Sequence, residues 1–473
     1  MKRDGAVWGA ALVLLFVVAY ADPLFVRRNF AGRDLLAYNL PMEKVVHDAY
    51  ARGRLPVWMP EISGGRPLLP NPNAGALYPV RPLLAKISFP AAMRIFPPLH
   101  WALAALGIFS LLSVLGATRP AAWVGAVSYA FSGVAVSEVF YLHILPGLAL
   151  LPWIVWATAR PSGTPRGRAL LLAVLFALEM LAGDVFSIAL SLSASILWIL
   201  LEERREQRAA RGLSLAAALG LAALAAFPQI VATLFWIAES ERAVTGMRLR
   251  ESLLFTLRPV RLLELLIPFP FGSTFALDAT EVWGRAVFFP KASGLFETLY
   301  CGAFALIAAL GLARARIAGA RFSRWFLILT VAAACLPSLI PKSWLGFHSP
   351  VALRNPEKFA VGIVFALGIL AGLAFDRFRA AAPSSRLLLA IAALLAIAAA
   401  AAWTWPRAAR SFVPGVPVES EASAAAEGRK FGVARAEAGL FWAATILAIE
   451  ALRRRSRAGA AAAAAVLTFV PVA

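Results

Sequence analysis

The chain has 473 residues, 60% of them hydrophobic, and a formal net charge of +20 at pH 7. Its mean hydropathy of +0.74 and its continuous apolar runs, each near the roughly 20 residues that cross a bilayer, exclude a soluble domain and a β-barrel. The basic residues cluster in short loops, as in the cytoplasmic loops of membrane proteins, so the charge does not indicate nucleic-acid binding. The composition therefore predicts an all-α polytopic membrane protein.

The N-terminal segment fits two interpretations. Lys2-Arg3 precedes an apolar run from Ala6 to Ala19, and Ala19-Tyr20-Ala21 has the pattern of a signal-peptide cleavage site. The same run is typical of a first membrane helix that is not removed. We favour the uncleaved helix, because the orientation that it sets continues through the whole series of spans that follows.

Hydropathy predicts about thirteen spans. Every second loop between them is rich in arginine, which places the N-terminus in the cytoplasm. The long loops 23–91, 239–293 and 406–436 then lie outside, and so does the expected active face. The predicted spans lie near residues 6–22, 92–116, 121–138, 144–159, 168–183, 185–201, 213–237, 294–313, 325–340, 358–376, 387–405, 437–452 and 458–473.

The chain is expected to divide into a core and a C-terminal part. Residues 1–379 would form a transmembrane core that includes the outer loops 23–91 and 239–293, and residues 380–473 would add Ala-rich transmembrane helices. The final run is short for a span, and we interpret it as a truncation or a shorter form. No internal repeat is visible, which argues against the transporter folds built from inverted repeats.

The first outer loop is the most polar and most proline-rich long stretch of the chain. Pro41 suits the first turn of a helix and Gly53 suits its end, with one apolar stripe between them and a polar face opposite. We therefore expect a short amphipathic helix on the membrane surface. The prolines that follow reduce the freedom of the loop, so that it can hold side chains in place; they are Pro56, Pro60, Pro67, Pro70, Pro72, Pro79 and Pro82.

Asp34 is the main candidate for chemistry in this loop. A carboxylate so close to the first span can act as a general base or as a ligand of a divalent metal such as Mg²⁺ or Mn²⁺, although a solvated loop aspartate or a helix cap has the same sequence signature. Glu43 and His47 share one helix face, either as part of a site or as a solvated surface. Trp58 either anchors or packs the loop, or stacks on a sugar ring.

Other polar residues lie near membrane depth, where charged groups are functional candidates by default. Glu179 lies inside the fifth span, and the residues at predicted outer span ends are Glu138, His143 and Asp184. Arg354 and Lys358 would share a helix face and bind a lipid phosphate, or would snorkel as an interfacial pair. The chain has no P-loop and no nucleophile elbow, so an enzyme of this kind would use energy stored in a substrate.

Several motifs of the first outer loop carry a resemblance to a known family. They are Asp34 with Tyr38 and Pro41, Gly53-Arg-Leu-Pro-Val-Trp-Met-Pro60, Gly64-Gly-Arg-Pro67, Asn71-Pro-Asn73 and Tyr78-Pro79. Together they resemble the first outer loop of the YfhO-like bacterial membrane proteins. Weaker matches continue to about Arg379, among them Leu353-Arg354-Asn-Pro356-Glu-Lys-Phe359.

The YfhO-like family is similar to the GT-C class of glycosyltransferases. The resemblance implies transfer of a sugar from a polyprenyl-phosphate donor to an envelope glycan, lipid or protein acceptor, with membrane lipids as further partners. Asp34 would deprotonate the acceptor hydroxyl or hold a divalent metal, and Arg354 would contact the donor phosphate.

The residues expected to bind substrate are Tyr38, Glu43, His47, Trp58, Asn71, Asn73, Tyr78, Glu138, His143, Arg354 and Lys358. Two other functions stay open. One is a lipid or polysaccharide transporter, and the other is a non-catalytic membrane assembly subunit.

Overall fold

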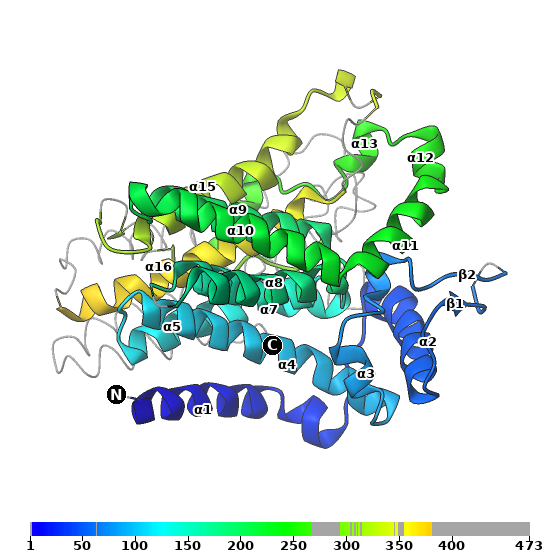
Figure 1. The fold of residues 1–473 in the computed structure, drawn as a ribbon, viewed down its shortest axis with the longest axis horizontal. Helices are drawn as coiled ribbons and strands as arrows, with labels where there is room; N and C mark the ends of the chain where they lie inside the picture. Colours follow the sequence, from blue (N-terminus) through cyan, green and yellow to red (C-terminus); the bar gives the residue numbers. More distant parts are fainter. Residues whose placement is uncertain are drawn as a thin grey trace, which may run out of the picture.

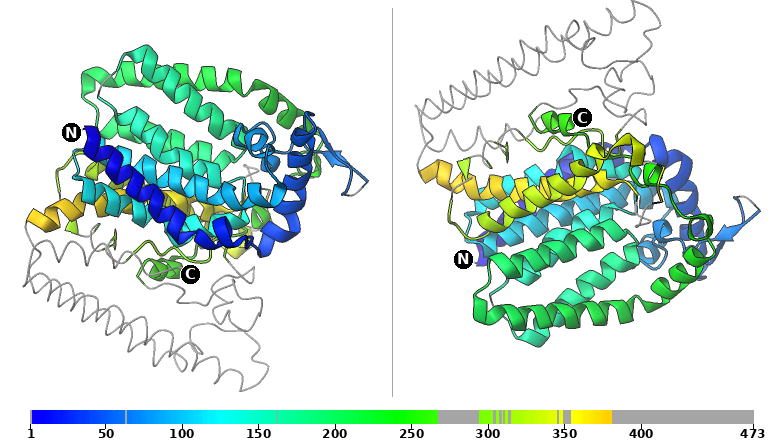
Figure 2. Two further views of the ribbon diagram at one scale, coloured as in Figure 1. Left: turned by 90° about the horizontal axis from the view of Figure 1, so that it is seen from below. Right: turned by 90° about the horizontal axis from the view of Figure 1, so that it is seen from above.

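The computed structural model describes residues 2–62, 64–161, 163–266, 294–302, 305–306, 309, 311–312, 315–344, 346–348 and 354–380. Most helices lie side by side along one direction (Figure 1). The first loop, residues 20–88, gathers at one end of this bundle, which we call the first-loop end (Figure 2). The helices of the bundle are α1 (Lys2–Ala19), α4 (Phe89–Val114), α5 (Arg119–Ala130), α6 (Gly133–Ser137), α7 (Leu145–Ala159), α8 (Pro165–Ala182), α9 (Val185–Leu201), α10 (Arg205–Ala225), α11 (Phe227–Ala238), α15 (Ala320–Cys335) and α16 (Ala360–Ala380).

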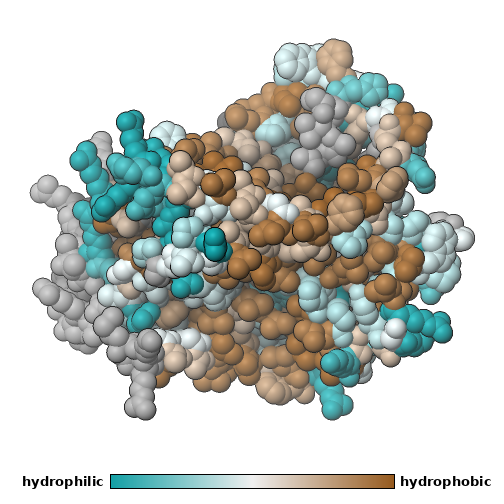
Figure 3. Space-filling view, viewed as in Figure 1, coloured by the Kyte–Doolittle hydropathy of each residue, from teal (hydrophilic) through white to brown (hydrophobic). Residues whose placement is uncertain are grey.

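Four helices of the described residues are long and apolar enough to cross a membrane, and α5 with Gly133–Phe140, bent by 42°, would be a fifth span. Apolar residues cover the middle of the face in Figure 3, and polar residues gather toward its two ends. These features support a multi-pass membrane protein. Thirteen spans are not confirmed, and the three predicted after residue 386 lie outside the described residues.

Helix α16 forms the centre of the bundle. Every residue from Ala360 to Phe375 is buried, as expected for a helix that is apolar on all sides. It packs against α5 and α15. Gly125 and Gly368 allow the α5 and α16 backbones to approach closely, since a Cβ on Gly125 would lie 2.6 Å from the Gly368 carbonyl oxygen.

Two predicted spans have a different backbone in the structure. Residues 294–302, predicted as the start of a helix, are buried but irregular; carboxylates satisfy part of this backbone, which hydropathy cannot predict. The predicted span 213–237 divides at Ala226 into α10 and α11, because Pro228 starts a new helix and cannot continue the old one.

The first loop folds against the end of the bundle around a small core of its own. The predicted amphipathic helix is confirmed as α2 (Leu40–Ala51), which lies across the bundle end in Figure 1. A two-stranded hairpin, β1 (Trp58–Met59) and β2 (Arg66–Pro67), and the short α3 (Val80–Leu84) follow it. Two side chains of α11 attach to this loop: Gln229 donates to the Leu69 carbonyl (2.8 Å) and Thr233 to the Pro70 carbonyl (2.8 Å).

Gly183 joins the first loop to the bundle. It ends α8 with a φ of +94°, and a Cβ at this position would overlap the carbonyl oxygen of Pro72 in the first loop. Only glycine adopts this conformation easily and leaves space for the carbonyl. The contact therefore sets the distance between the first loop and the α8–α9 turn.

We expect Gly183→Ala to destabilise the protein by more than the roughly 1–2 kcal/mol that a left-handed conformation alone costs. Gly53→Ala is the matched control, because Gly53 has a φ of +69° and a Cβ added there would meet no other atom within 4 Å. The measurement is the thermal midpoint of each purified variant in detergent. Equal losses in the two variants would contradict a close contact at Gly183.

Candidate functional site

Asp34 lies on a tight turn of the first loop. Gly32 and Arg33 both have positive φ, at +125° and +43°, and a Cβ on Gly32 would lie 3.1 Å from the Phe140 ring. The turn starts the helical segment Leu35–Asn39, and the Asn39 amide donates to the carbonyls of Asp34 (3.0 Å) and Phe140 (2.8 Å). These contacts fix the backbone at Asp34, whereas the Asp34 residue as a whole is exposed to solvent.

Arg33 ties this turn to the irregular segment 294–302. Its Nη1 donates to Glu297 Oε1 at 2.6 Å, and its Nη2 donates to the Gly294 carbonyl at 2.7 Å. The guanidinium also lies 5.7 Å and 5.8 Å from the ring centroids of Phe140 and Tyr141. Because Asp34 follows Arg33 directly, these contacts also fix the turn that carries Asp34.

A buried charge network holds segment 294–302 from its other side. Arg261 donates to both oxygens of Glu264 (2.6 Å and 3.0 Å) and pairs with Glu357, and all three side chains are 1% exposed. The two carboxylates accept backbone N–H bonds from Leu295 (3.0 Å) and Leu299 (3.0 Å). Buried charges need such partners, because an unpaired one costs several kcal/mol.

Glu264 shows how strongly burial acts here. Burial raises the pKa of Glu264 to about 7, although the Arg261 charge and its hydrogen bonds oppose the rise. Arg261 also donates a hydrogen bond to the Phe296 carbonyl oxygen (2.9 Å). The network therefore joins the 3-10 helix Pro259–Leu265, segment 294–302 and the start of α16 into one rigid unit.

Lys358 follows Glu357 directly in the 3-10 helix Pro356–Phe359. Its ammonium pairs with Asp184, which caps α9 and accepts hydrogen bonds from the Ser187 backbone N–H (2.9 Å) and hydroxyl (2.7 Å). Burial raises the pKa of Asp184, but the charge and hydrogen bond of Lys358, together with His143 and the Ser187 hydrogen bond, bring the net pKa below its ordinary value. Lys358 is therefore a fixed cation with only 10% of its side chain exposed.

Glu138 and His143 lie buried beside this ion pair. Glu138 is fully buried, and within the described part of the chain neither carboxylate oxygen has a hydrogen-bond partner. Burial lowers the pKa of His143 to about 3, and the Lys358 charge acts in the same direction. His143 is thus a neutral ring at physiological pH. Such unpaired buried groups are typical of functional sites.

Tyr141 connects the two halves of the site electrostatically. Burial raises the pKa of Tyr141, Arg33 opposes the rise, and the carboxylates of Asp34, Glu357 and Glu297 add to it. The Arg33 guanidinium lies over the Tyr141 ring and binds segment 294–302, so it links the Asp34 turn to the part of the chain that the charge network holds. The structure brings together three predicted site residues, namely Glu138, His143 and Lys358.

Backbone strain gathers at the same place. Four non-glycine residues of the described chain have positive φ, and three of them, Arg33, Phe255 and Asn355, belong to this site. The Phe255 carbonyl accepts the Glu357 backbone N–H at 2.9 Å, and Asn355 lies two residues before Glu357. Strained positions cluster at functional sites, where the surroundings hold them.

Other predicted site residues make contacts that support the first loop. Glu43 pairs with Arg81, and Tyr78 forms a hydrogen bond with His100 of α4 (3.0 Å). His47 contacts the Ile87 carbonyl (2.9 Å). Asn71 and Asn73 both donate to the Tyr38 hydroxyl (3.4 Å each). A role in substrate binding stays a prediction for these residues.

Trp58 and Arg354 are two further predicted site residues. Trp58 is 52% exposed on the hairpin, with its ring against Gly65. Arg354 is partly buried in irregular backbone, so the expected helical pair with Lys358 is wrong. Asn355 is left-handed with a φ of +68° and Pro356 follows it, and a residue before proline is kept out of the α-helical region.

Sequence reasoning missed the residues that hold the site, namely Arg33, Arg261, Glu264, Glu297 and Glu357. Glu297 gave one usable signal, because a carboxylate inside a predicted span is a functional candidate by default. Arg261 and Glu264 lie in a long polar loop, where charges are ordinary.

Comparison with solved structures finds the same fold in membrane glycosyltransferases of the GT-C class. ArnT from Cupriavidus metallidurans in the apo state matches with a TM-score of 0.52 and 17% identity, over 98% of this chain and 75% of that chain. The arabinofuranosyltransferase AftD from Mycobacteria matches with a TM-score of 0.51 and 17% identity, over 93% of this chain and 28% of that chain. No family model and no curated protein matches the chain.

We expect His143 to make the protein less stable in acid. Between the ordinary histidine pKa and the value near 3 in the fold, the unfolded chain binds one more proton, so the free energy of unfolding falls as pH falls, by up to about 1.4 kcal/mol per pH unit. Thermal unfolding of wild type and His143→Gln from about pH 7 to about pH 4.5 measures this.

The His143→Gln variant should have the shallower dependence on pH. His348→Gln is the control, because His348 is exposed and its loss should leave the wild-type slope unchanged. Identical slopes in wild type and His143→Gln would show that His143 is not held neutral.

Proposed function

We propose that this protein is an integral membrane glycosyltransferase of the GT-C type. It would move a sugar from a polyprenyl-phosphate donor to an envelope glycan, lipid or protein on the extracytoplasmic face of the bacterial cytoplasmic membrane. The observation that carries the proposal is Asp34, an exposed carboxylate on a fixed turn beside a buried charge network in a GT-C-like fold. The first-loop end would be the extracytoplasmic end, and the resemblance to YfhO-like proteins supports this orientation.

The proposed reaction is a direct displacement at the anomeric carbon of the donor sugar. Asp34 accepts the proton of the acceptor hydroxyl while the hydroxyl oxygen forms a bond to the anomeric carbon. The bond between that carbon and the lipid phosphate breaks, and the phosphate leaves with the electron pair. Arg33 positions Asp34, because its guanidinium is fixed on Glu297 and on backbone carbonyls. A carboxylate held in this way needs less reorganisation to reach the transition state.

Lys358 is the proposed contact for the leaving phosphate, and Arg354 is a second candidate. A fixed ammonium stabilises the charge that develops on the phosphate, and Asp184 holds Lys358 in place. Trp58, exposed on its hairpin, is the proposed stacking surface for an acceptor sugar.

Mg²⁺ or Mn²⁺ at Asp34 belongs to the proposal as an alternative role. The described residues contain no group of three His, Cys, Asp or Glu side chains that could hold a metal ion alone. These residues therefore do not form a metal site by themselves, and no step of the proposed reaction is assigned to a metal ion.

We expect Asp34→Asn to lower glycosyl transfer by about 10²- to 10⁴-fold, the range for loss of a general base. The measurement is mass spectrometry of envelope glycans from cells that carry wild type, Asp34→Asn or a deletion. Asp22→Asn is the matched control, because Asp22 is another exposed carboxylate of the first loop. An unchanged glycan profile with normal protein abundance would favour a non-catalytic assembly subunit instead.

A further inference from the structure

We propose that an apolar hollow beside the Asp34 turn binds one acyl chain of an anionic glycerophospholipid, whose phosphate lies on a basic rim. This lipid site is separate from the donor and acceptor sites of the proposed function. Its role would be to hold the Asp34 turn against α4.

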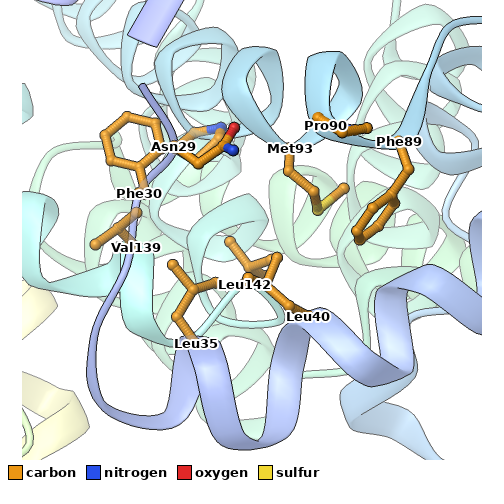
Figure 4. Close-up of a pocket in the computed structure, with 10 residues that line it drawn as sticks. Asn29, Phe30, Leu35, Leu40, Phe89, Pro90, Met93, Val139 and Leu142 are labelled. Carbon is orange, nitrogen blue, oxygen red and sulfur yellow. The ribbon is translucent and has the colours of Figure 1, made fainter. Parts of the chain in front are cut away.

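The hollow lies between the first loop, the outer part of α4 and the turn after α6. Its volume is about 100 Å³, which is room for a few methylene groups of a chain whose remainder lies outside the hollow. Figure 4 shows Asn29, Phe30 and Val139 at one side, Met93, Pro90 and Phe89 at the other, and Leu35, Leu40 and Leu142 between them. Apart from Asn29, every lining side chain is apolar.

Apolar lining of this kind selects a hydrocarbon chain. A polar ligand would lose its hydrogen bonds with water there and find only Asn29 as a partner. Other apolar side chains close in sequence to the lining residues are exposed: Phe25 and Val26 are 68% and 59% exposed, and Leu36 is 50% exposed. Exposed apolar residues in short helical turns after a membrane helix are typical of contact with the bilayer surface.

The rim of the hollow is basic. Arg94 lies next to Met93 and donates to the Asn29 amide oxygen at 3.5 Å, so its guanidinium reaches the mouth. Arg27 and Arg28 are exposed and directly precede Asn29, and Lys86 is exposed three residues before Phe89. The sequence has no acidic residue from Pro23 to Arg33 or from Arg81 to Pro98.

This charge selects an anionic headgroup. Arg28 has one carboxylate partner, Asp22 at 2.9 Å, and both side chains are more than half exposed, so that pair adds little and leaves the arginine able to bind a phosphate. Arginine and lysine at a membrane surface are attracted to anionic lipid. Several such residues above an apolar hollow match a phosphate joined to an acyl chain.

The position of the hollow beside the Asp34 turn indicates what a bound lipid would do. Leu35, which lines the hollow, follows Asp34 directly, and Phe30 lies four residues before Asp34 on the same turn. A chain in the hollow would fill the space between this turn and α4 and remove the freedom of the turn to move into it. Bound lipid would therefore stabilise the first loop.

The test is native mass spectrometry of the full-length purified protein with phosphatidylglycerol or phosphatidylcholine of identical acyl chains. Met93→Trp and Leu142→Trp fill the hollow, and the double variant Arg27→Gln/Arg94→Gln removes rim charge. Leu83→Trp and Arg250→Gln are the controls: Leu83 is exposed on α3 and outside the lining, and Arg250 is exposed on α13 (Leu249–Ser252). Thermal unfolding checks that each variant is folded.

We expect wild type to retain phosphatidylglycerol about tenfold better than phosphatidylcholine, and each filling or rim variant to lose about that factor. The controls should bind as wild type does. Equal retention of both lipids, or full retention by both filling variants, would overturn the proposal. So would displacement of phosphatidylglycerol by undecaprenyl phosphate, because the hollow would then belong to the donor.

The lipid proposal and the proposed function fail independently. Asp34→Asn should keep phosphatidylglycerol binding even where it abolishes transfer, since its carboxylate lies outside the hollow lining. Failure of wild type to bind phosphatidylglycerol, with transfer intact, would reject the lipid site alone.

Discussion

The buried contact between Arg261 and its two carboxylates, Glu264 and Glu357, is the constraint on which the site depends. Segment 294–302 runs through the protein interior without helical hydrogen bonds, and an apolar surrounding gives its N–H groups no water. The two carboxylates accept hydrogen bonds from the backbone N–H groups of the segment, and the positive charge of Arg261 offsets the cost of burying the carboxylates. Without this arrangement the segment would have to leave the interior or become a helix.

The charge network fixes two other parts of the site. Through Glu297 and its neighbouring carbonyls it holds Arg33, and with Arg33 the turn that carries Asp34. Through Glu357 it sets the start of α16, where Lys358 meets the α9 cap at Asp184. A carboxylate and a cation from opposite parts of the sequence therefore face one rigid frame. The proposed transfer reaction would need such a frame, because proton removal and phosphate departure would occur around one carbon.

Local chemistry made part of this structure predictable. The Pro41 and Gly53 signals and the apolar stripe between them located α2. The first-loop motifs pointed to Asp34 as a catalytic residue, which stays a prediction. Hydropathy identified the apolar segments but not their backbone, so segment 294–302 was predicted as helix. The Glu43–Arg81 pair also escaped prediction: spacing placed Glu43 on a polar helix face, either as part of a site or as a solvated surface, and its partner lies 38 residues away. Long-range charge pairing depends on tertiary packing, which periodicity does not contain.

The contact between Arg33 and segment 294–302 has a consequence for how this region can change over evolution. Two of its hydrogen bonds end on main-chain oxygens, those of Gly294 and Leu295, and another ends on the Glu297 side chain. Apart from Glu297, the guanidinium therefore recognises where the chain runs and not which side chains it carries there. Replacements at positions other than Glu297 would be tolerated by this contact, whereas a one-residue insertion or deletion would shift both oxygens at once. Homologues should therefore vary in composition here but keep the segment length constant.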